Sequence, residues 1–191
     1  MRKKVCITLL GLLLTVTAFA AKEKNSIQVK GSDTMVNLAQ AWAEEFSKNN
    51  PGVNVAVTGG GSGTGIASLI NGTCDIAETS RSMKDREISL AGGKGIKPIE
   101  HIVALDGIAV VVNPENPLKD LTIGQLRDIF MGTITNWKEL GGENRRIVLL
   151  SREVNSGTHV FFKEHVLRKG NEKGPEEFAP DALLMPSSQA I

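Results

Sequence analysis

The sequence predicts an α/β protein with a largely parallel sheet, because strand-like and helix-like patterns alternate along most of the chain. Residues 26–31 alternate apolar and polar positions as a half-buried strand does, and apolar residues from 35 to 46 recur at helical spacing. Residues 49–52 (NNPG) end that helix. The chain of 191 residues is 41% hydrophobic and 23% charged, which suits a globular domain or two small lobes.

The same alternation continues to the end of the chain. We expect strands at 53–60, 74–80, 96–105, 107–113 and 145–151. We expect helices from the glycine-rich loop to about residue 71, at about 84–90, after the cap residue Thr122, and at about 158–169. Trp42 and Phe46 are expected in the core, Cys74 in a buried strand, and residues 104–107 at the crossing between two lobes.

The first twenty residues have the pattern of a secretory signal peptide. Three basic residues at positions 2–4 precede an apolar run at 5–16, and residues 18–20 (AFA) form a small-x-small cleavage site after Ala20. Removing residues 1–20 removes three positive charges and no negative ones, so the formal net charge changes from +1 to −2. A chain of this charge has no overall positive field for nucleic acid, so any anion site must be built locally.

Small and hydroxylated turns follow four of the predicted strands, where helices begin. They are residues 31–34, 61–64, 79–82 and 151–158. Such turns gather at the carboxyl edge of a parallel sheet, and helix starts there present N–H groups to anions. Arg81 and Arg152 add guanidinium donors. One such turn alone is more often an ordinary helix cap, but the four together favour an oxyanion site.

Other kinds of site fit the sequence less well. The loop at 59–65 lacks the lysine of a phosphate-binding P-loop and the spacing of a dinucleotide fingerprint, and Thr64 breaks a GxSxG nucleophile motif. The three histidines are too dispersed for a metal cluster. We therefore expect no catalytic residues, no metal and no cofactor.

Five segments resemble the periplasmic phosphate-binding proteins of bacterial ABC transporters, the PstS family. They are GSDTM (31–35), GGGSGTGI (59–66), ETSRSM (78–83), LTIGQLRDIFMGTITNWKELGG (121–142) and SREVNSGT (151–158). The resemblance runs from about Ile27 to the last residue. It implies a two-lobed periplasmic-binding-protein-like (type II) α/β fold, with residues 21–105 as lobe 1 and residues 106–191 as lobe 2. Family members continue well beyond Ile191, so we expect an incomplete second lobe and a truncated chain.

The resemblance also implies a set of phosphate-binding residues. Ser32 and Thr34 correspond to first-turn donors, Ser62 to a hydroxyl donor of the glycine loop, and Arg152 to the clamp from the second lobe. The full expected set is Ser32, Asp33, Thr34, Ser62, Ser80, Arg81, Arg152, Ser156, Gly157 and Thr158. Many family members have an aspartate after the third strand to accept the proton of hydrogen phosphate, whereas this chain has Ser80 and Arg81. Asp33 is the plausible acceptor here, or else a helix cap.

The function implied by the resemblance is that of a non-enzymatic receptor. It would bind inorganic phosphate between two lobes and deliver it to the membrane permease of an ABC transporter. The chain would be a monomer, secreted across the inner membrane to the periplasm or the outer face of the cytoplasmic membrane. The alternatives are a receptor for another oxyanion such as sulfate or molybdate, a non-functional truncated fragment, and a phosphatase-like enzyme.

Overall fold

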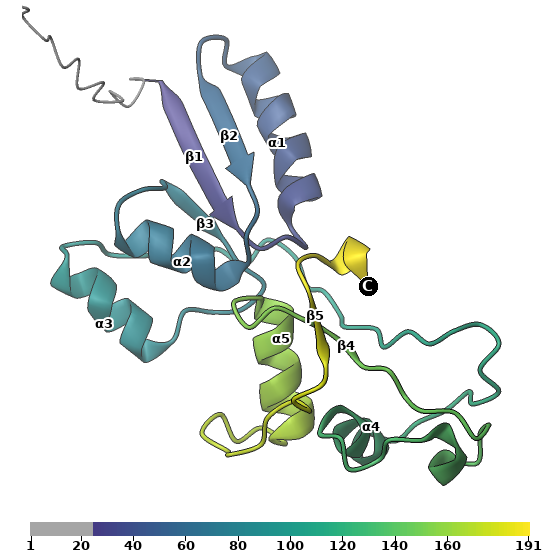
Figure 1. The fold of residues 1–191 in the computed structure, drawn as a ribbon. Helices are drawn as coiled ribbons and strands as arrows, with labels where there is room; N and C mark the ends of the chain where they lie inside the picture. The colour runs from purple at the N-terminus through teal and green to yellow at the C-terminus, as the bar shows by residue number, and fades with distance from the viewer. Residues whose placement is uncertain (1–24) are drawn as a thin grey trace, which may run out of the picture.

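A three-stranded parallel sheet organises the first half of the protein. The computed structural model describes residues 25–191 (Figure 1), so the predicted signal peptide at 1–20 lies outside the described residues. Strand β1 (Ser26–Gly31) lies between β2 (Asn54–Thr58) and β3 (Ile76–Glu78). Helix α1 (Val36–Asn49) packs against β2, and α2 (Ser62–Ile70) packs against β1 and β3. Helix α3 (Asp85–Gly93) then packs against α2.

The core of this half lies between α2 and α3. Ile66, Ile70 and Ala91 form a buried cluster, and Met83 and Ile96 pack against it. Helix α2 reaches the sheet closely because Gly65 has no side chain. A Cβ at that position would lie 2.4 Å from the carbonyl oxygen of Lys30. Cys74 is buried, as predicted, but it lies just before β3 (Ile76–Glu78) and not in the strand.

The second half of the chain contains a smaller parallel sheet. Strand β4 (Leu150–Arg152) pairs with β5 (Leu183–Met185). The helices of this half are α4 (Ile123–Phe130), the short η1 (Trp137–Leu140), α5 (Gly157–Phe162) with its π-helical extension η2 (Lys163–Leu167), and η3 (Ser188–Ala190). As expected, Thr122 caps α4: its side-chain oxygen accepts a hydrogen bond of 3.1 Å from the backbone N–H of Gln125.

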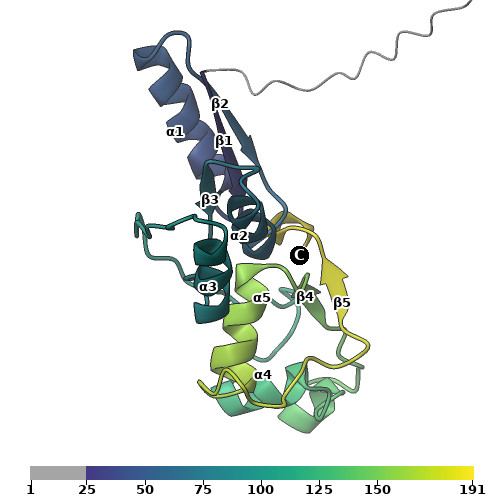
Figure 2. The same ribbon diagram turned by 90° about the vertical axis from the view of Figure 1, so that its left-hand side faces the viewer.

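An aromatic cluster packs the helices of the second half together. The ring centroids of Phe130 and Phe162 lie 4.7 Å apart, and Phe178 lies edge-on to Phe130 at 6.0 Å. Figures 1 and 2 both show the C-terminal segment beside the carboxyl end of the first sheet. The two halves therefore meet at the end of the sheet where the predicted anion-binding turns lie.

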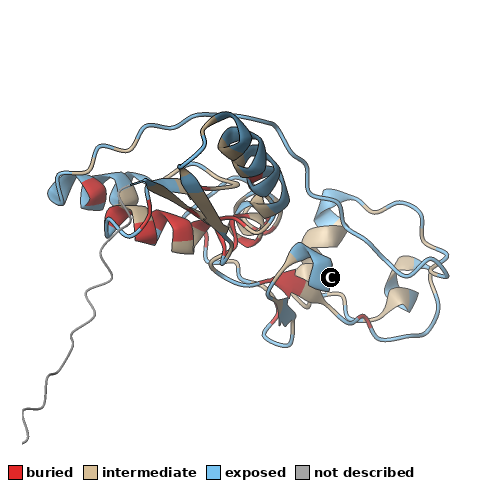
Figure 3. Cartoon of the chain, turned by 90° about the horizontal axis from the view of Figure 1, so that it is seen from above, coloured by how far each residue is buried: buried red, intermediate tan, exposed pale blue. Residues whose placement is uncertain are grey.

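Two predicted strands, at 96–105 and 107–113, do not form. Both segments are extended and largely exposed (Figure 3), with Leu105 at 95% and Val111 at 67% of full exposure. An apolar run forms a strand when a neighbouring strand pairs with its backbone, and no strand within residues 25–191 pairs with these two. The strand predicted at 145–151 shortens to β4 for a related reason, because its partner β5 has three residues.

The aromatic residues of α1 are another difference from prediction. Trp42 and Phe46 are 47% and 43% exposed rather than in the core. Helix α1 packs mainly against the edge strand β2, so a single narrow face is covered and Ala39 is its buried residue. Across residues 25–191, no helix is both long and apolar enough to cross a membrane.

Candidate anion-binding site

Hydroxyl groups from three turns meet at the carboxyl end of the first sheet. The hydroxyl of Ser32 donates to Ser80 Oγ at 3.1 Å, and the Oγ atoms of Ser62 and Ser80 are 3.2 Å apart. Ser32 Oγ also lies 2.9 Å from Thr34 Oγ1. Ser32 and Ser62 are almost fully buried. Because β1, β2 and β3 are parallel, the turns that follow them reach the same edge, and there they form a compact cluster of hydroxyl groups.

Arg152 brings a buried positive charge to this cluster from the end of β4. Its guanidinium group is 4% exposed and donates to Asp33 Oδ2 at 2.9 Å, to Ser188 Oγ at 2.8 Å and to the carbonyl oxygen of Pro186 at 3.1 Å. The other carboxylate oxygen of Asp33 accepts the backbone N–H of Gly60 at 2.8 Å. Asp33 thus holds Arg152 in place and joins the two halves of the molecule.

The glycine loop contacts the turn that follows β4. The backbone N–H of Gly63 donates to the carbonyl oxygen of Asn155 at 2.9 Å, and the side-chain amide of Asn155 donates to the carbonyl oxygen of Gly60 at 2.8 Å. Gly61 has φ 86°, and a Cβ there would lie 2.9 Å from the Asn155 carbonyl oxygen. In this arrangement the glycines permit a close backbone contact between the two halves, whereas the sequence suggested that they face an anion.

The start of α5 lies directly against the hydroxyl cluster. A Cβ on Gly157 would lie 2.3 Å from Ser80 Oγ and 2.6 Å from Ser62 Oγ. Ser156 is buried and is the N-cap residue of α5. Thr158 lines a cavity of about 1310 Å³ together with Asp33, Thr34, Arg152 and the apolar segment 107–112. The predicted residues of the second half therefore face those of the first.

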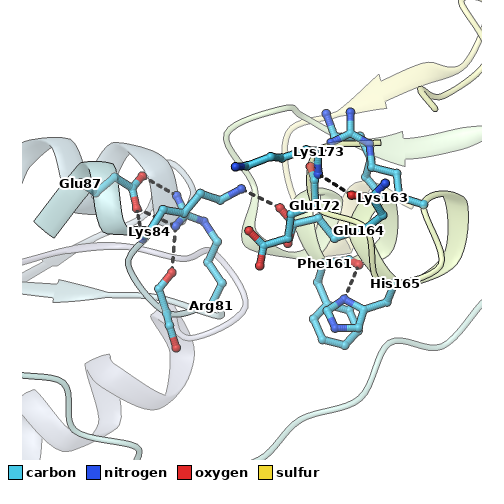
Figure 4. A network of polar contacts seen from close by, with 12 residues as sticks. Arg81, Lys84, Glu87, Phe161, Lys163, Glu164, His165, Glu172 and Lys173 are labelled. Atoms are coloured by element: carbon cyan, nitrogen blue, oxygen red, sulfur yellow. Dashed lines mark hydrogen bonds and ion pairs between the residues drawn. The ribbon is translucent and has the colours of Figure 1, made fainter. Parts of the chain in front are cut away.

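Arg81, which the sequence predicts to be an anion donor, forms an ion pair with Glu87. Both terminal nitrogens of its guanidinium group donate to the carboxylate of Glu87, at 2.9 and 2.8 Å (Figure 4). The hydrogen bond from Arg81 is the main cause that lowers the pKa of Glu87. Glu87 lies in the first turn of α3 and also accepts the backbone N–H of Lys84. Arg81 is thus bound to the carboxylate at the start of α3.

A second ion pair joins the two halves outside the cluster. Lys84 Nζ lies 2.6 Å from Glu164 Oε1, and Figure 4 shows the lysine reaching across from the start of α3 to η2. Lys84 is about half-exposed. A pair at a partly exposed position contributes little stability, on the order of 1 kcal/mol or less. It is a contact that can open and close at small cost.

Sequence reasoning missed Glu78. This carboxyl group ends β3, is 5% exposed, and has no hydrogen-bond partner for either oxygen within the described part of the chain. Burial, and secondarily the charge of Asp33, raise the pKa of Glu78 to about 7. The one signal was a glutamate inside the apolar strand pattern CDIAET, and a glutamate in a strand is usually exposed.

His159 was also missed as part of the site. Its ring is buried against Phe178, and Nδ1 lies 2.8 Å from the carbonyl oxygen of Arg152. Burial lowers the pKa of His159, so the neutral ring with a proton on Nδ1 can donate to that carbonyl group. The same nitrogen is 3.4 Å from Ser151 Oγ, and both residues are buried. Because both side chains also contact the carbonyl oxygen of Arg152, they hold the backbone at that residue.

The chemistry available in the site is that of hydrogen-bond donation to an anion. It combines hydroxyl groups, a buried guanidinium group and backbone N–H groups. Within residues 25–191, no group of three or more histidine, cysteine, aspartate or glutamate residues could hold a metal ion.

Comparison with known proteins matches this arrangement. Residues 17–184 match the family model of the PBP superfamily domain. The chain is 36% identical over 146 residues to the phosphate-binding protein PstS of Bacillus subtilis (strain 168), covering 76% of this chain and 47% of that protein. It is also 36% identical over 174 residues to the phosphate-binding protein PstS of Pseudomonas aeruginosa (strain PAO1), covering 84% and 52%.

Solved structures give the same result. A phosphate ABC transporter substrate-binding protein from Clostridium perfringens, with bound phosphate, superposes with a TM-score of 0.74 at 37% identity, covering 87% of this chain and 64% of that one. An ABC-type phosphate transport receptor from Vibrio cholerae superposes with a TM-score of 0.63 at 34% identity, covering 86% and 64%. The chain spans about half the length of the curated relatives it matches. With its mixed α/β architecture and its matched family model, this chain belongs to the PBP superfamily.

Proposed function

We propose that the protein is a receptor that binds inorganic phosphate between two lobes and delivers it to the membrane permease of an ABC transporter. The lobes are residues 21–105 and 106–191. The observation that carries the proposal is the buried hydroxyl cluster of the first sheet, flanked by Asp33, which binds the buried guanidinium group of Arg152 from the second. The PstS relatives and the phosphate-bound structure give the identity of the anion.

The proposed ligands supply donors from both lobes. Lobe 1 offers the hydroxyl groups of Ser32, Thr34, Ser62 and Ser80, which bond to one another at 2.9–3.2 Å and can each turn a proton toward an anion. Lobe 2 offers Arg152 and the backbone N–H groups of Ser156, Gly157 and Thr158. Asp33 acts as the partner that positions Arg152. Charge-assisted hydrogen bonds of this kind, away from water, supply affinity without a positive net charge.

Binding requires the two lobes to separate first. Gly157 packs against Ser62 and Ser80 so closely that a single methyl group has no room between them. A tetrahedral anion between these residues must therefore push α5 away from the hydroxyl cluster. The contacts of Asn155 with the glycine loop and of Lys84 with Glu164 would break or lengthen during opening. The bound anion then stabilises the conformation in which both lobes donate hydrogen bonds to it.

A binding role fits this site better than an enzymatic one. The serine and histidine that approach each other, Ser151 and His159, are both buried and bond mainly to the backbone of Arg152. A phosphatase would need a nucleophile or a base that reaches a bound ester. We therefore propose a non-enzymatic receptor, secreted as a monomer to the periplasm or the outer face of the cytoplasmic membrane.

Isothermal titration calorimetry of the full chain tests this function. We expect phosphate to bind, sulfate and molybdate to bind at least tenfold more weakly, and Arg152→Ala to lose at least tenfold in phosphate affinity. Arg145→Ala is the matched control, because Arg145 is 74% exposed and pairs with Glu143 on the surface. Equal binding of phosphate and sulfate would refute phosphate selectivity, and turnover of a phosphomonoester that Arg152→Ala abolishes would refute the receptor role.

A further inference from the structure

Glu78 is a buried carboxyl group next to the proposed phosphate site. We propose that Glu78 couples oxyanion binding at this site to the uptake of a proton by its own carboxyl group. This inference rests on the proposed function and adds to it a proton-linked residue behind the hydroxyl cluster.

The backbone of Glu78 is part of the site. Its carbonyl oxygen accepts the backbone N–H of Ser32 at 2.8 Å, and Ser80 follows two residues later. In the parallel ladder Glu78 lies opposite Gly31, the last residue of β1. A Cβ on Gly31 would lie 3.2 Å from Glu78 Cγ, so the missing side chain leaves room for the glutamate stem. Glu78 is therefore fixed between the two turns that supply Ser32 and Ser80.

The side chain of Glu78 lacks the partners that a buried charge needs. Glu78 is 5% exposed, and neither of its carboxylate oxygens has a hydrogen-bond partner among the described atoms. Buried polar side chains in folded proteins are nearly all hydrogen-bonded, so each exception calls for an explanation. A protonated carboxyl group has a smaller desolvation cost than an ionised one, which favours the neutral form here.

The charged groups around Glu78 do not offer it a cation. On β1, Lys30 pairs with Ala77 and so lies on the opposite face of the sheet. Helix α2 has no charged residue, and the two terminal nitrogens of Arg81 are bound by Glu87. The charged group that acts on Glu78 is Asp33, which carries the same sign.

The result is a carboxyl group that titrates near neutral pH. Burial, and then Asp33, raise the pKa of Glu78 to about 7. An oxyanion at Ser32 and Ser80 brings further negative charge close to the same carboxyl group and must raise its pKa again. Linkage is reciprocal, so a proton on Glu78 strengthens anion binding by the same factor. Above about pH 7 the ionised group would oppose the ligand.

Calorimetry of the full chain in two buffers of different ionisation enthalpy, between pH 6 and 8, measures the protons taken up with phosphate. Phosphate itself titrates in this range, so Glu78→Gln is compared with wild type to subtract its contribution. Glu115→Gln, at an exposed position, is the matched control. We expect wild type and Glu115→Gln to take up more protons than Glu78→Gln. From pH 6 to 8, the phosphate affinity of these two chains should fall by a factor about three- to tenfold larger than that of Glu78→Gln. This difference corresponds to a rise of about half to one unit in the pKa of Glu78 on binding.

Two results would overturn the inference while leaving the receptor function intact: equal proton uptake by wild type and Glu78→Gln, or equal dependence of their affinities on pH. If phosphate binds to neither chain, both the function and the inference fail. If Glu78→Gln does not fold, the wild-type chain labelled with ¹³C in its glutamate carboxyl groups gives the answer by NMR titration. The pKa of Glu78 must then rise when phosphate is added, and an unchanged pKa refutes the coupling.

Discussion

Arg152 and Asp33 form a buried ion pair that joins the end of β4 to the turn after β1, with 2.9 Å between Nη2 and Oδ2. The pair connects residues 119 positions apart in the chain. It gives Asp33 a definite role, since the carboxylate accepts from Arg152 and Gly60 at once. Asp33 therefore positions the guanidinium group that we propose as the phosphate clamp.

Removing Asp33 should destabilise the protein. In Asp33→Ala the buried guanidinium group loses its counter-charge, which we expect to lower the free energy of unfolding by about 1–3 kcal/mol. Urea denaturation followed by circular dichroism measures this change. Asp181→Ala is the control, because the Arg146–Asp181 pair is 74% and 60% exposed and its loss should cost about 0.5 kcal/mol or less. Equal losses in the two variants would show that the Arg152–Asp33 pair is no more important than a surface pair.

Gly157→Ala should weaken phosphate binding. The added Cβ would lie 2.3 Å from Ser80 Oγ and 2.6 Å from Ser62 Oγ, and so would occupy the space between α5 and the hydroxyl cluster that the proposed anion needs. We expect a loss of at least tenfold in phosphate affinity by calorimetry. Gly92→Ala is the matched control in α3, where a Cβ meets nothing within 4 Å. That variant should keep its affinity and gain up to about 1 kcal/mol of stability. Unchanged affinity in Gly157→Ala would place the anion away from α5.

The stability of the protein should depend on pH through Glu78. Burial raises the pKa of Glu78 from its ordinary value of 4.5 to about 7 in the folded chain, so the folded state binds more protons between these values. The free energy of unfolding must then fall as pH rises from about 4.5 to 7, by up to about 3 kcal/mol. Urea denaturation at pH 5, 6, 7 and 8 should show that Glu78→Gln lacks this part of the slope. Burial also lowers the pKa of His159, but the resulting pH dependence of the free energy of unfolding is the same in wild type and variant. Parallel curves for the two chains would mean that Glu78 is ionised throughout.

Two apolar truncations should differ because their environments differ. Ile66 is 1% exposed in the cluster between α2 and α3, and Ile66→Ala should cost about 2–4 kcal/mol. Val111 lies in the extended segment and is 67% exposed, so Val111→Ala should cost about 0.5 kcal/mol or less. Thermal or urea unfolding measures both. A large loss in Val111→Ala would reveal that the segment 107–113 is packed in solution.

The first half of the fold follows closely from local patterns. Strand, turn and helix alternate at short range, and each predicted element from residue 26 to 93 forms within a few residues of its expected bounds. The hydroxyl cluster is predictable for the same reason, since parallel strands carry their following turns to one edge. The signals there lie within the segments themselves.

The differences arise where a residue's surroundings come from distant parts of the chain. The run GIAVVVN reads as a buried strand, but a strand also needs a partner, and within residues 25–191 none pairs with it. Arg81 reads as an anion donor, but Glu87 in the next helix binds both of its terminal nitrogens. Glu78 reads as an ordinary strand residue, and its burial depends on the packing of β1 and α2 around β3. None of these three outcomes is visible in the local sequence.

The most direct test of the central claim is an NMR titration of the ¹⁵N-labelled full chain with phosphate. We expect saturable shifts of the backbone amides of Ser32, Ser62, Ser80 and Gly157, which belong to both halves of the molecule. We expect much smaller shifts when sulfate is added at the same concentrations. Phosphate shifts confined to other residues, or no saturable shift at all, would contradict the claim that the hydroxyl cluster and Arg152 together form a phosphate site.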